Sequence, residues 1–291
     1  MSASLWQAVA TSEAEMLVRE LGLDALPVCP FSIAEKLGIE VRPLPACSHA
    51  GVSGILLRHD SNFGILYATY LDNEGFQRFC IGHEIGHYRL PGHPEIVFTA
   101  GVHMSHAGFI SKDRFELEAD HFAAGLLMPG FLFDAATDKA GTGLEAIEKL
   151  AGRCLASLTA TAIRYAQRTP EAAAIIVSAA HAIDYCFMSD SLRELRGLEW
   201  LRKGSSLPRT SVTYRFNSHP ANVAHGDRAD GHASLQDWFG GDLQAKLYEE
   251  VIGLGGYGKT LTILTASDLP DAEEIEEEEE LVESWKPKFR R

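Results

Sequence analysis

Three residues in the segment CIGHEIGHYRLPGH (residues 80–93) have the types and the spacing of a metal site. His83 and His87 stand four residues apart, so on a helix both imidazoles project from one face and can bind one divalent cation. Glu84 follows His83, where its carboxylate can take a proton from a water molecule beside the metal. The HExxH pattern therefore predicts metal-dependent hydrolysis, with Zn2+ as the metal and Glu84 as the general base.

A catalytic zinc site needs a third protein ligand and one open position for water. His93 is one candidate, because it is the eleventh residue counted from His83, the spacing of the metzincin motif. That motif requires glycine at the eighth place, where the chain turns sharply, and this sequence has Leu90 there. His93 therefore stays an alternative to a ligand from elsewhere in the chain.

The other candidate lies in the segment DRFELEADHFAAGLLMP (residues 113–129). Glu116 and Asp120 are four residues apart and share a helix face, so Glu116 can bind the metal while Asp120 holds a ligating histidine by its other ring nitrogen. Glu118 remains open as the ligand, since it also precedes the apolar HFAAGLL stretch. Asp113 with Glu116 would alternatively form a helix capping box.

Elements that could position these residues follow from periodicity. Residues 73–90 are predicted to form a helix, because Phe76, Cys80, His83 and His87 fall on one stripe and Pro91-Gly92 ends it. Residues 94–112 lack periodicity and are expected to form a loop or irregular strand. Other helices are expected at 3–21, 33–37, 113–128 and 144–167, and strands at 39–42, 52–58 and 63–70, the last two as a hairpin that could offer an edge to an extended substrate.

A domain boundary is expected near Thr169-Pro170, so residues 1–168 would form a catalytic domain with a helical extension and 169–270 a small α+β regulatory or docking domain. In the second region AAAIIVSAA, TSVTYRF and KTLTILTA are predicted strands, and LQAKLYEEVI is a predicted helix. Residues 271–291 contain nine acidic and four basic residues and are expected to form an acidic tail.

The segment GLGGYGKT (residues 253–260) satisfies the phosphate-binding pattern GxxxxGK[ST]. That pattern works only between a strand and a following helix, because the amides at the helix N-terminus bind the phosphates. A helix-like segment precedes it here and a β-branched segment follows it, so we interpret it as a glycine-rich turn between a helix and a strand.

Composition excludes several classes of protein. The formal net charge of −14 argues against direct nucleic-acid binding and against an acidic membrane surface. Five cysteines without CxxC spacing do not form a disulfide framework. The first residues lack the basic and apolar regions of a signal peptide, and no apolar run reaches about 18 residues. The expected location is the cytoplasm, without a membrane span.

The segment QRFCIGHEIGHYRL, followed about thirty residues later by ELEADHFAAGLLMP, resembles the ImmA/IrrE family of zinc-dependent metallopeptidases. PFSIAEKLGIEV and LAGRCLASLTATAIRYAQ are also similar to segments of that family, so the resemblance covers about residues 28–168. It assigns His83, His87 and Glu116 to zinc and Glu84 to catalysis. The family's usual asparagine is Asp120 in this chain.

The resemblance implies an α+β fold: a zincin-like metallopeptidase domain with a small antiparallel sheet and the HExxH helix, then a helical segment and a smaller α+β C-terminal domain. It also implies cleavage of a regulatory protein, such as a helix-turn-helix transcriptional repressor, that relieves repression in a stress or mobile-element response. The alternative is a non-catalytic regulator, an antirepressor or toxin–antitoxin type of partner-binding protein with a structural or vestigial zinc site. His103, His106 and His121 have no clear role, although His121 or Tyr88 could stabilise an oxyanion.

Overall fold

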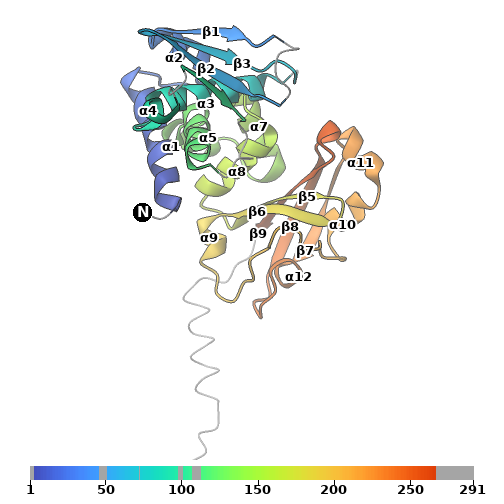
Figure 1. Cartoon of the computed structure of the whole chain (residues 1–291). Coiled ribbons are helices and arrows are strands. Elements are labelled where there is room, and N and C mark those ends of the chain that lie inside the picture. The colour runs from blue at the N-terminus through green and yellow to red at the C-terminus, as the bar shows by residue number, and fades with distance from the viewer. Residues whose placement is uncertain (1–2, 46–50, 72, 98–100, 107–112, 267–291) are drawn as a thin grey trace, which may run out of the picture. The chain divides into compact units, whose positions relative to one another are not determined.

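The computed structural model describes residues 3–45, 51–71, 73–97, 101–106 and 113–266. The chain forms two compact units, Met1–Thr169 and Pro170–Arg291, and both combine helices with a β-sheet (Figure 1). The expected α+β class is therefore confirmed. The acidic tail expected at 271–291 lies outside the described residues. No helix within the described part of the chain has the length and apolar character needed to cross a membrane.

The first unit contains a four-stranded sheet with the order β1-β3-β2-β4. Its strands are β1 (Ile39–Pro43), β2 (Gly54–His59), β3 (Asn62–Tyr67) and β4 (Val102–Ser105). An antiparallel sheet was expected, but the sheet is mixed because β1 runs parallel to β3, while β2 is antiparallel to both β3 and β4. The chain reverses direction between β1 and β2 and again at the β2–β3 turn, so β3 takes the direction of β1.

The sheet order also corrects the expectation that the hairpin offers a free edge. β3 lies between β1 and β2, and β2 lies between β3 and β4, so both hairpin strands are paired on both sides. The edge nearest β2 is instead β4, within residues 94–112, which were expected to form a loop or irregular strand. This segment also contains the short helix α4 (His93–Val97). Elements of four or five residues are too short to show a periodicity.

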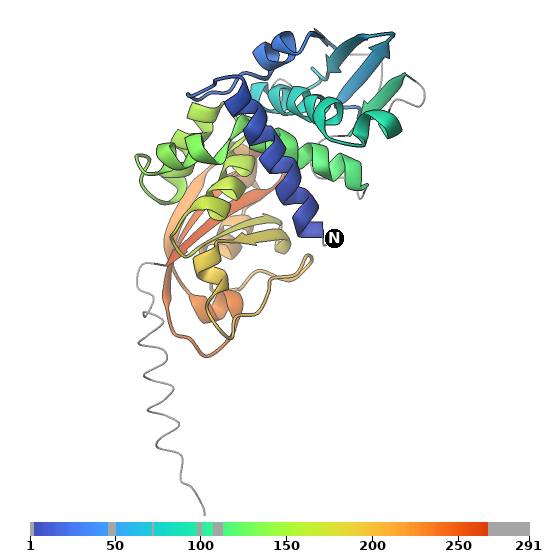
Figure 2. The ribbon, with the colours of Figure 1, turned by 90° about the vertical axis from the view of Figure 1, so that its left-hand side faces the viewer.

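The first unit has three long helices, of which α3 packs against β2 and β3: α1 (Ala3–Glu20), α3 (Glu74–Arg89) and α5 (Arg114–Leu127). Helix α3 begins where the Asn73 side chain accepts a hydrogen bond from the Phe76 N–H, and it ends before Leu90, whose extended backbone precedes Pro91. Helices α3 and α5 pack against each other, and α1 lies along α5 (Figure 2). The other helices are α2 (Pro30–Lys36), α6 (Gly130–Thr137), α7 (Gly143–Cys154) and α8 (Leu158–Arg168).

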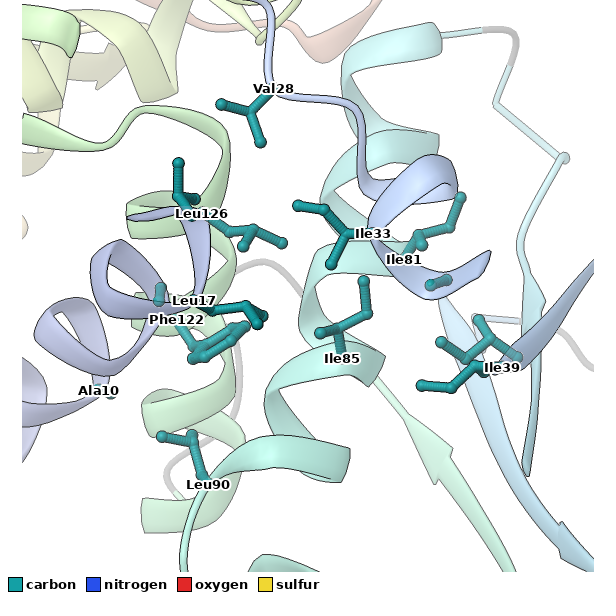
Figure 3. Close-up of a cluster of buried hydrophobic side chains, with 14 of the residues drawn as sticks. Ala10, Leu17, Val28, Ile33, Ile39, Ile81, Ile85, Leu90, Phe122 and Leu126 are labelled. Atoms are coloured by element: carbon teal, nitrogen blue, oxygen red, sulfur yellow. The ribbon is translucent and has the colours of Figure 1, made fainter. Parts of the chain in front are cut away.

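The main core of the first unit lies between these helices and one face of the sheet. Leu17 of α1, Ile85 of α3 and Phe122 of α5 point into the same space, with Ile33 of α2 and Ile39 of β1 beside them (Figure 3). All five side chains are buried. Removing this apolar surface from water fixes the position of α3, because α2, α5 and the strands β2 and β3 all pack against it.

The second unit is an antiparallel five-stranded sheet with the order β6-β5-β9-β8-β7. β5 and β9 correspond to the predicted strands AAAIIVSAA and KTLTILTA. Two predictions in this unit are wrong: TSVTYRF contains helix α10, and LQAKLYEEVI contains strand β8. The bounds are β5 (Ala173–Ala179), β6 (Ala182–Met188), β7 (Arg228–Ser234), β8 (Lys246–Gly253), β9 (Thr260–Ala266), α9 (Asp190–Arg193), α10 (Val212–Asn217), α11 (Pro220–His225) and α12 (Leu235–Phe239).

The glycine-rich segment at 253–260 joins β8 to β9 through a short 3-10 turn at Gly255–Tyr257. It therefore lies between two strands and not between a helix and a strand. A strand follows the lysine and threonine of the pattern, so no helix N-terminus is present to bind a phosphate there.

Candidate metal centre

Helix α3 places the two histidines of the HExxH pattern on its buried face. The Nε2 atoms of His83 and His87 lie 3.0 Å apart, and both side chains are fully buried. A helix positions residues i and i+4 one turn apart on the same side, so the backbone alone brings the two nitrogens together. Both imidazoles therefore present Nε2 to one point.

Helix α5 brings Glu116 to that same point. One carboxylate oxygen lies 3.5 Å from His83 Nε2 and the other 3.2 Å from His87 Nε2. Potential ligand atoms of these three residues all lie within 4.8 Å of one another. Such separations suit three ligands that each bind one tetrahedral ion at about 2.0–2.2 Å. Two imidazoles and one carboxylate form one of the ligand sets known for catalytic metal sites, in which three protein ligands leave a fourth position for water.

Two glycines of helix α3, Gly82 and Gly86, allow the close approach of α5. A Cβ atom on Gly82 would meet the Ala123 Cβ at 3.3 Å, and one on Gly86 would meet the Ala119 Cα at 3.2 Å. Side chains at either position would push the two helices apart. Because α3 has glycine at both positions facing α5, the two helices lie close together and Glu116 reaches the histidines.

Asp120 fixes the orientation of His83. Its Oδ1 atom lies 2.8 Å from His83 Nδ1, and the carboxylate is buried. Although burial alone would lower the pKa of His83, the hydrogen bonds to Asp120 and Glu116 raise it to about 10. With the Nδ1–H donated to Asp120, Nε2 is the nitrogen left to face the cluster.

The Glu84 carboxylate lies beside this cluster in an unusual environment. It is completely buried, without a hydrogen bond of normal geometry among the described residues, and the neighbouring His83 and Ser105 only partly offset the effect of burial. Burial raises the pKa of Glu84 to about 7. Strand β2 makes room for it through Gly54, where an added Cβ would come within 2.2 Å of Glu84 Oε1. A buried carboxylate without a well-formed hydrogen bond is costly, so this group fits a site where water and a cation bind.

The structure separates the alternative ligands from the cluster. His93 is buried against the far side of His87, where the two Nδ1 atoms lie 3.1 Å apart. Burial lowers the pKa of His93 below its usual value. Glu118 lies 2.9 Å from His93 Nε2 and not beside the paired Nε2 atoms. Asp113 caps α5 through the Phe115 and Glu116 N–H groups, while the Glu116 side chain faces the histidines.

His103 joins the cluster, although the sequence had suggested no role for it. It lies on β4, and its Nε2 is 2.9 Å from Glu116 Oε1. Its ring centroid lies 4.5 Å from that of His87, and its side chain is 22% exposed, so it stands at the open side of the site. Hydrogen bonds to His103, His83 and His87 overcome the effect of burial and hold the pKa of Glu116 well below its usual range.

Tyr88 and His121, the two residues considered as groups that could stabilise an oxyanion, make other contacts. The Tyr88 ring packs against Phe63 with centroids 4.8 Å apart, in the apolar core of the first unit. His121 lies on α5, one residue after Asp120, and its backbone carbonyl accepts a hydrogen bond from Thr11. His103 is therefore the described histidine whose imidazole combines partial exposure with a hydrogen bond to the cluster, whereas His106 reaches Glu116 only through its backbone N–H.

Comparisons with known proteins agree with this picture. Residues 34–165 match the family model described as Peptidase_M78, IrrE N-terminal-like domain. Among solved structures, a Mycobacterium tuberculosis transcriptional regulator is 15% identical, with a TM-score of 0.57 over 91% of this chain and 82% of that chain. At this identity the likeness shows a shared fold. The comparison with curated proteins gave no match.

Proposed function

Because residues 34–165 belong to the Peptidase_M78 family of IrrE N-terminal-like domains, we propose that this protein is a zinc-dependent endopeptidase that cleaves a regulatory protein at a specific site. Glu84 carries the proposal. It is a fully buried carboxylate whose pKa is raised by burial, without a hydrogen bond of normal geometry among the described residues, next to the three-ligand cluster of His83, His87 and Glu116. A structural zinc site is closed by four protein ligands and has no use for such a base.

The residues divide the reaction between them. When bound, zinc supplies Lewis-acid chemistry, polarising the substrate carbonyl and making water acidic enough to react near neutral pH. Glu84 takes a proton from the attacking water and later passes it to the nitrogen of the leaving amine as the C–N bond breaks. With Glu116 bound to zinc, the Nε2–H of His103 would be free to donate a hydrogen bond to the oxyanion of the tetrahedral intermediate. Asp120 holds His83 in place throughout.

A transcriptional regulator is the substrate class that fits best. The chain has a net charge of −14, so it favours a basic partner through complementary charge, and DNA-binding proteins carry basic surfaces. A solved structure with this fold is described as a transcriptional regulator, which supports a place in transcriptional control. We propose a helix-turn-helix repressor as the substrate, with relief of repression in a stress or mobile-element response as the outcome.

The direct test incubates the zinc-loaded protein with the helix-turn-helix regulator encoded nearest to its gene. We expect one cut in the regulator, seen by mass spectrometry as two fragments with one new N-terminus, and we expect a chelator to prevent it. Tight binding that relieves repression while the regulator stays intact would instead establish the non-catalytic alternative, an antirepressor or toxin–antitoxin type of partner.

Strand β4 is the proposed binding site for an extended substrate segment. Within the described residues its only neighbour in the sheet is β2. Arg58 N–H donates to Gly101 O, and hydrogen-bonded residues alternate along an antiparallel pair, so Val102 and Met104 turn their backbone groups away from β2. His103 between them reaches Glu116. A peptide strand added to β4 would therefore run past the cluster.

Replacing Met104 by Pro should lower kcat/KM for cleavage by about tenfold, because proline removes one outward N–H that would bind the substrate backbone. Zinc affinity should stay unchanged, since proline is tolerated at unpaired positions of an edge strand. Met104→Ala keeps the N–H and provides the matched control. Steady-state kinetics on both variants check the prediction. Equal rates for Met104→Pro and Met104→Ala would argue against β4 as the binding strand.

A further inference from the structure

Each histidine of the cluster needs a partner for the ring nitrogen that faces away from it. His83 has Asp120 in direct contact. His87 has no carboxylate in that position and meets the ring of His93 instead, with 3.1 Å between the two Nδ1 atoms. Metal-binding histidines almost always donate this second N–H to a fixed acceptor, which sets the tautomer and the ring orientation. The partner of His87 is therefore expected to influence the metal site.

We propose that His93 and Glu118 form a buried hydrogen-bond chain that positions His87 for metal binding. Glu118 Oε2 lies 2.9 Å from His93 Nε2, so a carboxylate accepts the proton of that nitrogen. A neutral imidazole carries one N–H, which leaves His93 Nδ1 as an acceptor. It can then take the Nδ1–H of His87. These two hydrogen bonds leave the lone pair of His87 Nε2 directed at His83 and Glu116.

The chain is fixed at its far end by Arg114. Its Nε donates to Glu118 Oε1 at 2.5 Å, so both Glu118 oxygens have partners. The guanidinium in turn lies over the Trp6 ring of α1, 3.4 Å from the centroid. Phe115 packs against the His93 ring, with centroids 4.9 Å apart. These contacts hold the hydrogen-bonded side chains in place, from Trp6 on α1 to His87 at the metal site.

Spacing in the sequence fits this division of roles. Glu116 and Glu118 are two residues apart on α5, so they project from different sides of the helix. Glu116 turns to the paired Nε2 atoms, and Glu118 turns to His93 at the start of α4. His93 therefore acts through His87 and is a positioning residue, which explains its complete burial without a place among the ligands.

The test measures zinc affinity by competition with a chromophoric chelator. His93→Phe keeps an aromatic ring but removes both nitrogens, and we expect it to weaken zinc binding about 10–100-fold. His93→Gln can accept from His87 with its oxygen and donate to Glu118 with its nitrogen, so it should recover most of the affinity. His59→Phe, at the end of β2 with 93% of its side chain exposed, is the control and should bind zinc like the wild type.

Glu118→Leu gives a second route if His93→Phe fails to fold, and it should weaken zinc binding by up to about tenfold. The inference rests on the metal site of the proposed function but not on peptide cleavage. A wild-type protein that binds no zinc would contradict the proposed function itself. Wild-type affinity in His93→Phe, or His93→Gln binding no better than His93→Phe, would overturn the positioning role alone.

Discussion

Replacing Glu84 by Gln is expected to lower kcat for regulator cleavage by about 10²–10⁴-fold and to leave zinc binding intact. The amide has the size of the carboxylate, so it fits beneath Gly54 as Glu84 does, but it cannot take a proton from water. The three proposed zinc ligands, His83, His87 and Glu116, contact one another without involving the Glu84 side chain. Single-turnover cleavage and zinc titration of the same preparation measure the two properties separately.

The matched control is Glu74→Gln at the start of the same helix, where the side chain is 66% exposed. It should retain both cleavage and zinc binding. The thermal midpoint of Glu84→Gln should not fall, because the amide keeps the size of the carboxylate and burial already opposes the charge of Glu84. Cleavage at the wild-type rate by Glu84→Gln would remove Glu84 from the mechanism.

Replacing Glu116 by Gln is expected to abolish zinc-dependent stabilisation as well as cleavage. Glu116 is the one ligand contributed by α5, and its carboxylate faces both histidines. A ligand that binds only the folded protein stabilises it by about 4 kcal/mol at a concentration 1,000 times its Kd. Wild-type protein should therefore gain several degrees in Tm when zinc is added, and Glu116→Gln should gain almost none.

Calorimetry with and without zinc checks this prediction, and Glu74→Gln again serves as the control. A chelator should lower the Tm of the zinc-loaded wild type to the value of the Glu116→Gln variant. Equal zinc-dependent stabilisation in wild type and Glu116→Gln would mean that the third ligand comes from another residue, with His103 and His93 the nearest histidines.

Local helical spacing made the centre of the site predictable from sequence. His83 and His87 are one turn apart on α3, and Glu116 and Asp120 are one turn apart on α5, so each pair follows from the geometry of one helix. The contact between the two helices is a tertiary property, yet Gly82 and Gly86 already mark the side of α3 that accepts a close neighbour. Family resemblance supplied the link between the two segments.

The place of His103 in the site could not be predicted, because its strand β4 is defined by pairing with β2 and not by a pattern in its own sequence. β4 has four residues, and its partner β2 lies more than 40 residues earlier in the chain. Neither the alternation of side chains nor the composition of such a short segment distinguishes it from a loop. The same non-local pairing determines that β4, and not the hairpin, forms an edge of the sheet.

Buried polar contacts explain the two wrong predictions in the second unit. β8 alternates regularly, with Leu247, Glu249 and Val251 buried, but a charged residue in the middle position hides the apolar pattern. Glu249 is buried because its carboxylate accepts the N–H groups of Val212 and Thr213 at the start of α10. That contact also favours a helix in TSVTYRF, despite its β-branched and aromatic residues.

Anomalous diffraction at the zinc edge, from crystals of the zinc-loaded protein, tests the central claim most directly. We predict a single strong peak within bonding distance of His83 Nε2, His87 Nε2 and the Glu116 carboxylate. The Glu84 carboxylate should lie beside the peak without binding it, and His93 should remain on the far side of His87. A peak bound by His93 or Glu118 in place of Glu116, or no peak at this cluster, would contradict the account.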